Sequence, residues 1–444
     1  MNVVDIFAGA GGLGEGFSDA GFQVTASIDN DLHCINTLKT RALYRYFHRK
    51  NLDSRYFEIV KNHSSSYRAD LYNSLLSDGS INELVEDIDL SNTFDTKTKN
   101  KIQTLGKNCD VIIGGPPCQA YSLINTKSRN DSTDSRHILF KNYLHTIDLI
   151  KPKAFLFENV VGMTSAKIKN KNIIELFEND LKKMKTKYFI IPKKLKADNL
   201  SYSRRDYIYD MSLYGIPQRR KRFILVALRH DIYKNHDLNK LSIFFHSKED
   251  YDIKTTKDAI DDLPKVNSHT DRGDDIFLNK KYLQSKTSSY SKKLQNNYIK
   301  GVFNHCSRTH MKEDLDRYKF LAGLKTNERV SNTMELFKSK RPDLLPKHKN
   351  LNSFVDRFKV QYANLPSSTI TAHISKDGHY FIHYDQIQNR SLTVREAARL
   401  QSFKDDYFFE GPRTQQFKMV GNAVPPMFTR VIAKKIMDIL KNKI

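Results

Sequence analysis

Residues 1–29 read MNVVDIFAGAGGLGEGFSDAGFQVTASID, and this stretch decides the fold of the chain. Apolar residues 3–7 predict a buried strand, residues 9–14 form a glycine loop, residues 13–20 predict a helix, and residues 22–28 predict a second strand. Strand, glycine loop, helix and strand in this order make a β–α–β unit. Glycine lets the backbone turn sharply and approach a ligand, and the helix N-terminus offers free N–H donors.

The glycine loop is compatible with two kinds of nucleotide cofactor. Residues 9–14 match G-x-G-x-x-G, and Asp29 ends the next strand 20 residues after Gly9, where a carboxylate can accept hydrogen bonds from a nucleoside. The pattern alone fits a dinucleotide and an adenosyl cofactor about equally. Asp5 within the first strand and the Phe7-Ala8-Gly9 run favour a loop that closes on a methionine moiety rather than on a pyrophosphate.

Short apolar runs recur along the chain and extend the same architecture. Residues 110–113, 154–157 and 223–228 read as buried strands, the first two ending in polar loops. Strands of this kind, separated by helical segments, predict a doubly wound, mostly parallel α/β sheet with its chemistry at the carboxyl ends of the strands. Residues 72–105 and 164–205 are polar and weakly patterned, and we expect them to be insertions or surface elaborations.

The middle of the chain is predicted to be a separate domain. Residues 230–390 lack the regular alternation of predicted strands and helices. A helical pattern returns at residues 394–400, and residues 431–440 predict an amphipathic helix. We therefore expect one domain of residues 1–229 plus 391–444 and a second, irregular domain of residues 230–390 inserted into it. This division predicts that the C-terminal segment packs beside the N-terminal strand.

The composition indicates which class of partner the protein binds and in which compartment we expect it. Lys and Arg number 73 against 50 Asp and Glu, a formal charge of +23, which points to a polyanion such as nucleic acid, with a merely solvated lysine-rich surface as the alternative. No run approaches the roughly 18 apolar residues of a membrane span. Four cysteines without a C-x-x-C pair suggest neither a disulfide framework nor a zinc site, so we expect a reducing cytoplasm.

Three polar segments that adjoin predicted strands are candidates for chemistry. Residues 114–122 read GGPPCQAYS. Cys118 could be an ordinary buried cysteine, but a proline-stiffened polar loop can present a thiolate to a ligand. Glu158, in FENV (residues 157–160), is either a helix cap or a carboxylate at a strand end. The run QRRKR (residues 218–222) is either solvated or aimed at an anion.

Six motifs in order resemble those of the DNA (cytosine-5)-methyltransferase family. They are DIFAGAGG (residues 5–12), the three segments above, REAARLQSF (residues 395–403) and VGNAVPP (residues 420–426). Residues 230–365 fall outside them, where such enzymes carry a variable target-recognition region. The resemblance implies a Rossmann-like methyltransferase domain, dependent on S-adenosylmethionine, with a smaller, irregular target-recognition domain inserted.

The resemblance also implies a mechanism. Cys118 adds to carbon 6 of a flipped-out cytosine, which makes carbon 5 nucleophilic toward the methyl group. Glu158 hydrogen-bonds or protonates ring nitrogen 3, and Asn159 helps to hold the loop. Arg220, supported by Arg222, faces the cytosine carbonyl or a flanking phosphate.

By the same resemblance, two further sets of residues bind the cofactor and the DNA. Asp29 holds the ribose, Asp70 lies near the adenine, and Asn422 returns from the chain end; the full cofactor set is Phe7, Gly9, Gly11, Gly12, Asp29, Asn30, Asp70, Pro117 and Asn422. Asp29 stands where a glutamate is usual and Asn30 where many relatives carry an aromatic. Residues 276–312 hold eight basic residues and no acid, and the expected DNA contacts are Gln119, Ser122, Lys280, Lys281, Lys292, Lys293, Lys300 and Arg308.

The function implied is sequence-specific methylation of double-stranded DNA. We expect a monomer, encoded by a bacterium or a phage, that protects host DNA in a restriction-modification system. A restriction endonuclease encoded separately is a candidate partner. A tRNA substrate is one alternative, although the large recognition region argues against it. A catalytically idle DNA-binding regulator is another, although Cys118, Glu158 and Arg220 are all present.

Overall fold

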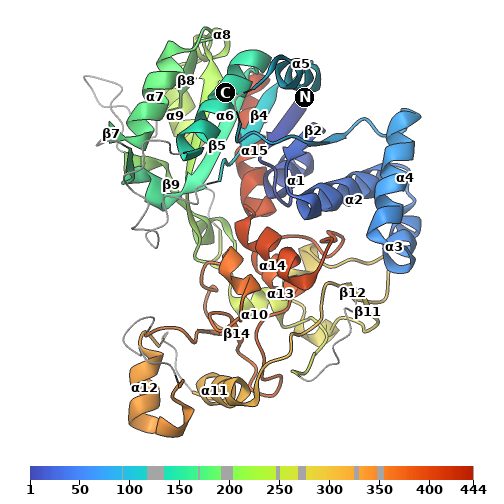
Figure 1. The fold of residues 1–444 in the computed structure, drawn as a ribbon, viewed down its shortest axis with the longest axis vertical. Coiled ribbons are helices and arrows are strands. Elements are labelled where there is room, and N and C mark those ends of the chain that lie inside the picture. The colour runs from blue at the N-terminus through green and yellow to red at the C-terminus, as the bar shows by residue number, and fades with distance from the viewer. Residues whose placement is uncertain are drawn as a thin grey trace.

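A computed structural model describes residues 1–92, 94–117, 135–168, 171–191, 204–246, 251–268, 277–324, 330–347 and 355–443 of the chain (Figure 1). Cys118, Gln119 and Ser122, which the sequence singles out, lie outside these ranges. Among the helices of the described ranges, none is both long enough and apolar enough to cross a membrane.

One large sheet organises the upper part of the molecule (Figure 1). Its strands pair in the order β3 (Leu84–Asp87), β2 (Gln23–Asp29), β1 (Asn2–Ile6), β4 (Val111–Gly114), β5 (Ala154–Val160), β10 (Lys221–Arg229) and β8 (Tyr188–Ile190), with β9 (Ile208–Asp210) also beside β10. The first five strands run parallel, whereas β10 runs antiparallel to β5, β8 and β9. The strand order is that of a doubly wound sheet, so the predicted fold class is confirmed.

Helices cover both faces of this sheet. Because side chains alternate along a strand, Val3 and Val4 of β1 point to opposite faces. Val3 joins a core with α1 (Gly12–Asp19), α9 (Leu238–His246) and α15 (Pro426–Leu440). Val4 joins a core on the other face with α5 (Thr96–Leu105), α6 (Ser135–Ile150) and α7 (Ile173–Lys183). The parallel strands are therefore buried on both sides, as their nearly continuous apolar sequences predict.

Helix α15 packs directly against α1, although the two helices stand at opposite ends of the sequence. Gly16 permits this close approach, because a Cβ atom at that position would lie 1.8 Å from Oγ1 of Thr429 and 2.5 Å from the carbonyl oxygen of Pro426. The Thr429 hydroxyl also donates to the carbonyl of Gly12 at 3.2 Å. The prediction that the C-terminal segment packs beside the N-terminal β–α–β unit is confirmed.

Three helices connect β2 to β3: α2 (Leu32–Arg49), α3 (Asp53–Asn62) and α4 (Ser65–Ser77). The buried guanidinium of Arg68 in α4 binds the carboxylate of Glu410 through Nε at 2.5 Å and Nη2 at 2.6 Å. After α4 the chain forms β3 and then α5, which belong to the main fold, so the expectation of an insertion or surface elaboration is wrong for residues 84–105. The apolar pattern of the sequence did not predict β3, because this strand has only four residues and two of them, Glu86 and Asp87, are acidic.

The second weakly patterned stretch also belongs to the body of the molecule. Within residues 164–205 the structure describes a small hairpin of β6 (Lys167–Ile168) and β7 (Lys171–Asn172), then α7 and β8. Helix α7 contributes Phe177 and Leu181 to the core, and β8 pairs with β10. Helix α7 therefore belongs to a helical layer of the main fold, and β8 forms an edge of its sheet. Neither element is a surface elaboration.

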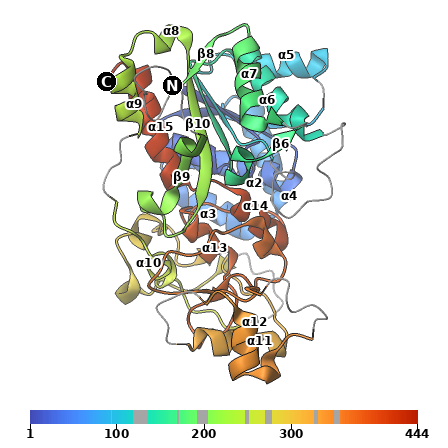
Figure 2. The ribbon, with the colours of Figure 1, turned by 90° about the vertical axis from the view of Figure 1, so that its left-hand side faces the viewer.

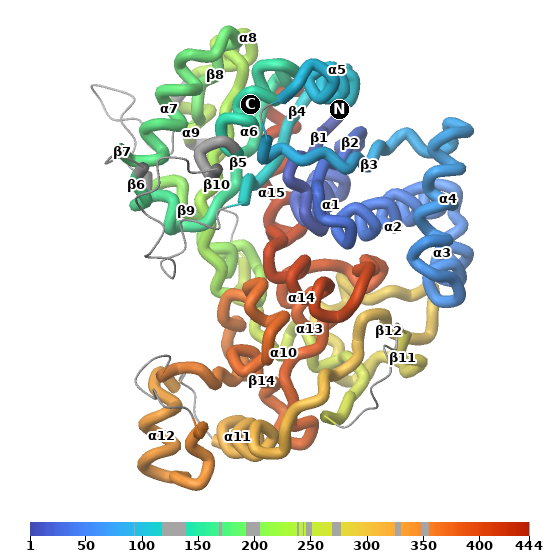
Figure 3. The backbone as a smooth tube through the Cα atoms, in the orientation of Figure 1, coloured from blue at the N-terminus to red at the C-terminus, as the bar shows by residue number. Residues whose placement is uncertain are grey.

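The chain below the sheet forms two more clusters (Figures 1 and 2). The first joins α10 (Thr256–Ile260) to α13 (Val394–Leu400) and α14 (Arg413–Asn422). The second is the distal lobe, residues 312–362 together with β14 (Ile382–His383), which contains α11 (Lys312–Ala322), α12 (Thr333–Lys340) and β13 (Val360–Gln361). Figure 3 shows the chain entering this lobe after residue 300 and returning from it to α13.

Two short segments of the predicted second domain, residues 230–390, pack on the upper part of the molecule. Helices α8 (His230–Tyr233) and α9 contribute Tyr233 and Leu241 to the core that contains α15. Strands β11 (Phe277–Leu278) and β12 (Val302–Phe303) pair with each other, and Phe303 packs with Phe57 of α3.

Candidate active site and cofactor site

The glycine loop lies at the carboxyl end of β1 and is tied to β2 by Asp29. The backbone N–H of Gly9 donates to Oδ2 of Asp29 at 2.8 Å, while Oδ1 accepts from the N–H groups of Asn30 at 2.9 Å and Asp31 at 3.0 Å. Burial raises the pKa of Asp29, and these three hydrogen bonds oppose the rise. Asp29 therefore fixes the loop against the neighbouring strand end, as a nucleoside site requires.

The remaining residues of the predicted loop line the same edge. Phe7 and Gly9 both have positive φ angles, of 55° and 54°, and no atom lies within 4 Å of a Cβ built on Gly9. That side of the loop is open, so a ligand can approach the backbone there. Gly11 caps the N-terminus of α1, and Gly12 is the first residue of that helix.

Strand β3 supplies a third strand end beside Asp29. Asp87 pairs with Asp29 across the two strands, and the N–H of Ile88 donates to the carbonyl of Asp29 at 3.1 Å. Asp87 and Asp89 are both exposed at this edge, and Asn30, also exposed, donates from Nδ2 to Oδ1 of Asp89 at 3.3 Å. The carboxyl ends of β1, β2 and β3 therefore form one polar edge.

Asp70 does not join this edge, which corrects the expectation that it lies near the adenine. It is exposed in the middle of α4, at the right-hand side of Figure 1. The chain returns to the sheet only with β3, so the residues that follow this strand occupy the place expected for Asp70. The signal in the sequence is Asp87-Ile88-Asp89-Leu90, a short alternation of acidic and apolar residues.

Glu158 and Arg222 form the target side of the site. The register places Ile224 opposite Glu158 and Arg222 opposite Val160, so Glu158 and Arg222 are diagonal neighbours on one face of the sheet. Nε of Arg222 lies 3.1 Å from Oε1 of Glu158. Burial raises the pKa of Glu158, although Arg222 opposes the rise. A carboxyl whose pKa is raised by burial takes up a proton more readily than a free one, and it can then donate that proton or a hydrogen bond to a base.

The loop that leads to Cys118 is attached to the end of β5. A Cβ atom on Gly115 would lie 2.5 Å from Oε2 of Glu158, so the backbone of the loop runs against this carboxyl group. Nδ2 of Asn159 donates to the carbonyl of Pro116 at 3.2 Å. Pro117, the last described residue before Cys118, is exposed. Asn159 thus holds the start of the loop, as expected for it.

Arg220 does not face the site, which corrects the expectation that it contacts the cytosine carbonyl or a phosphate. Its side chain is completely buried. Nη1 donates to the carbonyl of Ile370 at 2.7 Å, and Nη2 donates to those of Ala423 at 2.7 Å and Gly421 at 3.3 Å. Burial lowers the pKa of this guanidinium. Arg222, two residues further along, is the arginine that reaches Glu158.

The residues expected to contact DNA fall into two groups. Lys280, Lys281, Lys292, Lys293 and Lys300 are exposed. Arg308 is buried instead, with Nη2 donating to the carbonyl of Ile374 at 2.7 Å and Nη1 to that of Lys376 at 3.0 Å. It lies 4.5 Å from the ring centre of Phe417. Arg308 is therefore a packing residue, and its assignment as a phosphate contact is corrected.

Asn422 is the residue that the sequence leads us to expect at the cofactor from the end of the chain. Asn422 is exposed at the end of α14, between Gly421 and Ala423, whose carbonyls Arg220 holds. Within the described residues, no group of three or more His, Cys, Asp or Glu side chains could hold a metal ion.

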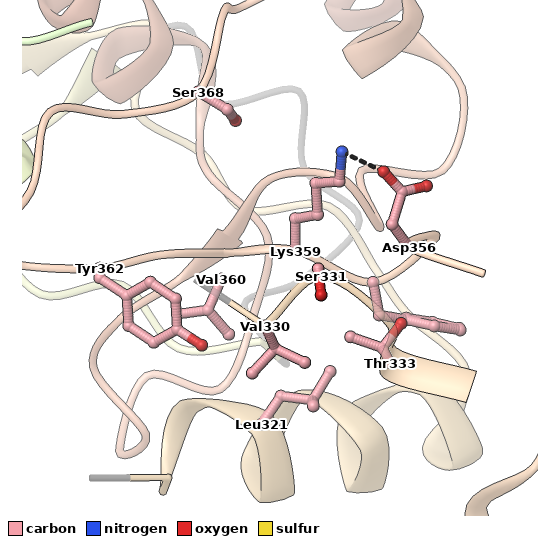
Figure 4. A pocket seen from close by; sticks show the side chains of 10 residues that line it. Leu321, Val330, Ser331, Thr333, Asp356, Lys359, Val360, Tyr362 and Ser368 are labelled. Atoms are coloured by element: carbon pink, nitrogen blue, oxygen red, sulfur yellow. Dashed lines mark ion pairs between the residues drawn. The ribbon is translucent and has the colours of Figure 1, made fainter. Parts of the chain in front are cut away.

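A pocket of about 270 Å³ lies in the distal lobe (Figure 4). Its floor is apolar and its rim carries Lys359, which forms an ion pair with Asp356 at 2.5 Å. None of the residues predicted from the sequence lines it. The lining residues are Leu321, Val330, Ser331, Thr333, Asp356, Phe358, Lys359, Val360, Tyr362 and Ser368.

Comparisons with known proteins bear on the whole chain. The model of a family described as C-5 cytosine-specific DNA methylase matches residues 1–65 and 84–438. The chain is 35% identical to the Type II methyltransferase M.Bpa9945I of Bacillus paralicheniformis, with 99% of each chain covered. It is 27% identical to the Type II methyltransferase M.DdeI of Desulfomicrobium norvegicum, with 100% of this chain and 90% of that protein covered.

Among solved structures, a similar fold occurs in a prophage-encoded E. coli protein described as a candidate DNA modification methyltransferase. The TM-score is 0.64 with 22% identity, and 99% of each chain is covered. The unmatched residues 66–83 of the family comparison coincide with most of α4 and the turn before β3.

Proposed function

This chain belongs to the C-5 cytosine-specific DNA methylase family, and on that premise we propose how its residues share the transfer of a methyl group to carbon 5 of cytosine in DNA. The observation that supports the assignment of roles is the pairing of Glu158 with Arg222 beside the loop that leads to Cys118. A buried carboxyl, a cation that touches it and a cysteine are the groups that the reaction needs.

In this proposal Cys118 forms a bond from its sulfur to carbon 6 of the cytosine. Glu158 donates a hydrogen bond or its proton to nitrogen 3, which draws electron density away from the ring as the thiolate adds. The raised pKa of this buried carboxyl favours the protonated form that the step requires. After methyl transfer, loss of the proton on carbon 5 and elimination of Cys118 restore the aromatic ring.

We assign to Arg222 the role expected of Arg220. Its guanidinium contacts Glu158 and is partly exposed, so it can donate to the carbonyl oxygen of the same base. Asn159 acts on the loop rather than on the base, because its amide holds the carbonyl of Pro116.

We propose S-adenosylmethionine as the methyl donor. The donor set fits this group: the loop is open at Gly9, Asp29 can accept from ribose hydroxyls, and Asp87 offers a carboxylate where an adenine ring would lie. Phe7, Gly11, Gly12, Asn30, Pro117 and Asn422 complete the proposed site. When bound, the cofactor supplies an electrophilic methyl group.

The proposed substrate is double-stranded DNA with a specific recognition sequence. The curated relatives are named Type II methyltransferases, which supports a role in a restriction-modification system with a separately encoded endonuclease. We propose a monomer of two domains, residues 1–229 with 391–444 and residues 230–390. Base reading is assigned to the distal lobe within the second domain, where Lys359 and Asp356 offer a donor and an acceptor at the rim of a pocket.

Bisulfite sequencing tests this function directly. The chain, and its Cys118→Ala and Glu158→Gln variants, would be expressed in a host that lacks cytosine methylation. We expect wild-type DNA to be protected at cytosines in one sequence context. Cys118→Ala should abolish protection, and Glu158→Gln should slow methyl transfer by roughly 10²- to 10⁴-fold in a purified assay, the range of a lost general acid.

The controls separate chemistry from folding and DNA from RNA. Both variants should retain cofactor binding, and Glu58→Gln, at an exposed position of α3, should retain activity. Full activity of the Cys118→Ala variant would refute the mechanism. Methyl incorporation into tRNA rather than into duplex DNA would favour the alternative substrate.

A further inference from the structure

The guanidinium of Arg220 is the point at which three distant segments of the chain meet. It binds the carbonyls of Ile370, Gly421 and Ala423 at 2.7, 3.3 and 2.7 Å, and its Nε is buried without a hydrogen-bond partner. No carboxylate of the described ranges forms an ion pair with it. A buried cation whose hydrogen bonds all go to backbone carbonyls is costly to maintain, so we expect a role beyond packing for this residue.

The first partner, Ile370, belongs to the segment through which the distal lobe is joined to the body. The N–H of Ser367 donates to Pro217 at 2.8 Å, and the N–H of Arg219 donates to Ser367 at 2.9 Å. The next residue, Ser368, lines the pocket of the lobe and bonds to Gln361 of β13 at 2.8 Å. A shift of the lobe therefore reaches Ile370 directly.

The other partners, Gly421 and Ala423, flank Asn422 in the turn assigned to the cofactor. A second set of buried hydrogen bonds also reaches this turn. Nε2 of Gln401 donates to the carbonyl of Val420 at 2.7 Å, and Nε2 of Gln218 donates to Oε1 of Gln401 at 3.1 Å. The segment that carries Gln218 and Arg220 therefore holds the cofactor turn through two independent sets of bonds.

The same segment also leads into the target side of the site. Arg222 lies two residues after Arg220 at the start of β10, and its guanidinium contacts Glu158. A guanidinium is a planar fork with fixed donor directions, so the positions of its three carbonyl partners depend on one another. Movement of the cofactor turn is thus transmitted both to the lobe segment and to the strand that bears Arg222.

We propose that Arg220 is a positioning residue that couples cofactor binding to binding of the DNA target. The proposal rests on the function above, in which Asn422 contacts the cofactor and the distal lobe contacts DNA. Ordering of the Gly421–Ala423 turn by the cofactor orders the Ile370 segment through Arg220, so the lobe is oriented for DNA. Because coupling is reciprocal, bound DNA strengthens cofactor binding by the same factor.

The test compares Arg220→Lys with Arg219→Lys. Arg219 is the neighbouring arginine and is exposed, so its variant makes the same chemical change outside the buried cluster. The dissociation constant of a duplex with the recognised sequence would be measured with and without S-adenosylhomocysteine, and that of S-adenosylhomocysteine with and without the duplex. We expect wild type and Arg219→Lys to show the same ratio, about fivefold or more, and Arg220→Lys to bring it close to one.

A merely structural role would weaken both affinities or the stability of the protein and leave the ratio unchanged, and that result would overturn the proposal. A wild-type ratio of one would overturn it as well. If Arg220→Lys does not fold, Thr369→Val takes its place, because it removes only the bond from the Thr369 hydroxyl to the carbonyl of Arg219. This variant should lower the ratio in the same direction, and an unchanged ratio would again contradict the coupling.

Failure of the underlying function would look different. In that case wild-type protein would bind neither S-adenosylhomocysteine nor the duplex, whereas failure of the coupling alone leaves both affinities measurable and the ratio unaffected by Arg220→Lys.

Discussion

At the scale of single residues, neighbouring positions with the same side chain have opposite environments. Arg219 is exposed, Arg220 is fully buried on backbone carbonyls, and Arg222 reaches a carboxyl group. A sequence pattern can identify such a run as functional, but it cannot distribute the roles, because those depend on which carbonyls and carboxylates the fold brings to each side chain.

The cofactor site gives a prediction that separates two aspartates. Asp87→Ala should weaken binding of S-adenosylhomocysteine by roughly 10-fold or more, the value of a hydrogen bond to a charged group. Asp70→Ala should leave the affinity unchanged, because Asp70 is exposed on α4. Isothermal titration calorimetry on both variants decides the matter, and a larger loss for Asp70→Ala would restore the assignment made from the sequence.

Asp5 gives a prediction about pH. Its Oδ2 accepts from the N–H of Gly14 at 3.0 Å, whereas its Oδ1 is buried without a hydrogen-bond partner. Burial raises the pKa of Asp5 from 3.8 to about 8, against the opposing Gly14 bond. Between these two values the folded protein holds a proton that the unfolded chain has released, so the free energy of unfolding should fall as pH rises from about 4 to about 8.

The variant Asp5→Asn removes this titration. Relative to wild type, it should therefore gain stability as pH rises through the same window. Urea unfolding at several pH values measures the difference, with Asp70→Asn as a control for the loss of an exposed carboxylate. A constant difference between Asp5→Asn and wild type across the window would show that Asp5 is ionised in the folded protein.

At the scale of elements, the sequence predicts well what depends on local apolar pattern. Strands β1, β2, β4, β5 and β10 and helix α1 lie where the apolar runs place them. What it could not predict depends on tertiary contacts: β3 is short and acidic, and the antiparallel direction of β10 is set by its pairing with β5. Asp87, at the end of β3, was overlooked for the same reason.

The contact between α1 and α15 carries a prediction at this scale. Gly16→Ala should destabilise the protein by about 1–3 kcal/mol or more, because the new methyl group would meet the backbone of Pro426 and Arg430, which cannot move aside as a flexible side chain can. Ser18→Ala, on the less buried side of the same helix, should cost much less. Urea unfolding of both variants measures the difference, and equal stabilities would mean that α15 shifts freely on α1.

At the scale of the whole molecule, the charge of +23 predicts a polyanionic partner but not where it is bound. Residues 276–312 look from their composition like a phosphate-binding stretch. In the structure several of its members are packing residues: Tyr290 is buried with its hydroxyl on the carbonyl of Arg399, and Arg308 is buried on Phe417. Composition cannot distinguish these from the exposed lysines beside them.

The last prediction therefore concerns the exposed lysines of residues 276–312. Replacing Lys292 and Lys293 together by Gln should weaken duplex binding and reduce the slope of log affinity against log salt by about 1 to 2, because fewer counterions are released. The methylated sequence should stay the same. Affinities at several salt concentrations and bisulfite sequencing of the variant provide the two measurements. An altered sequence preference would show that these side chains read bases.

The packing of α15 on α1 also affects when the protein can fold during its synthesis on the ribosome. Ribosomes add about 5–20 residues per second, so the helix that covers Gly12 and Gly16 is synthesised roughly 20 to 80 s after the helix it covers. During that interval the N-terminal β–α–β unit lacks one of its layers, and the nascent chain exposes an apolar face that chaperones bind. The enzyme can therefore complete its catalytic core only after α15 has been synthesised, which sets an earliest moment at which newly made protein can begin to methylate DNA.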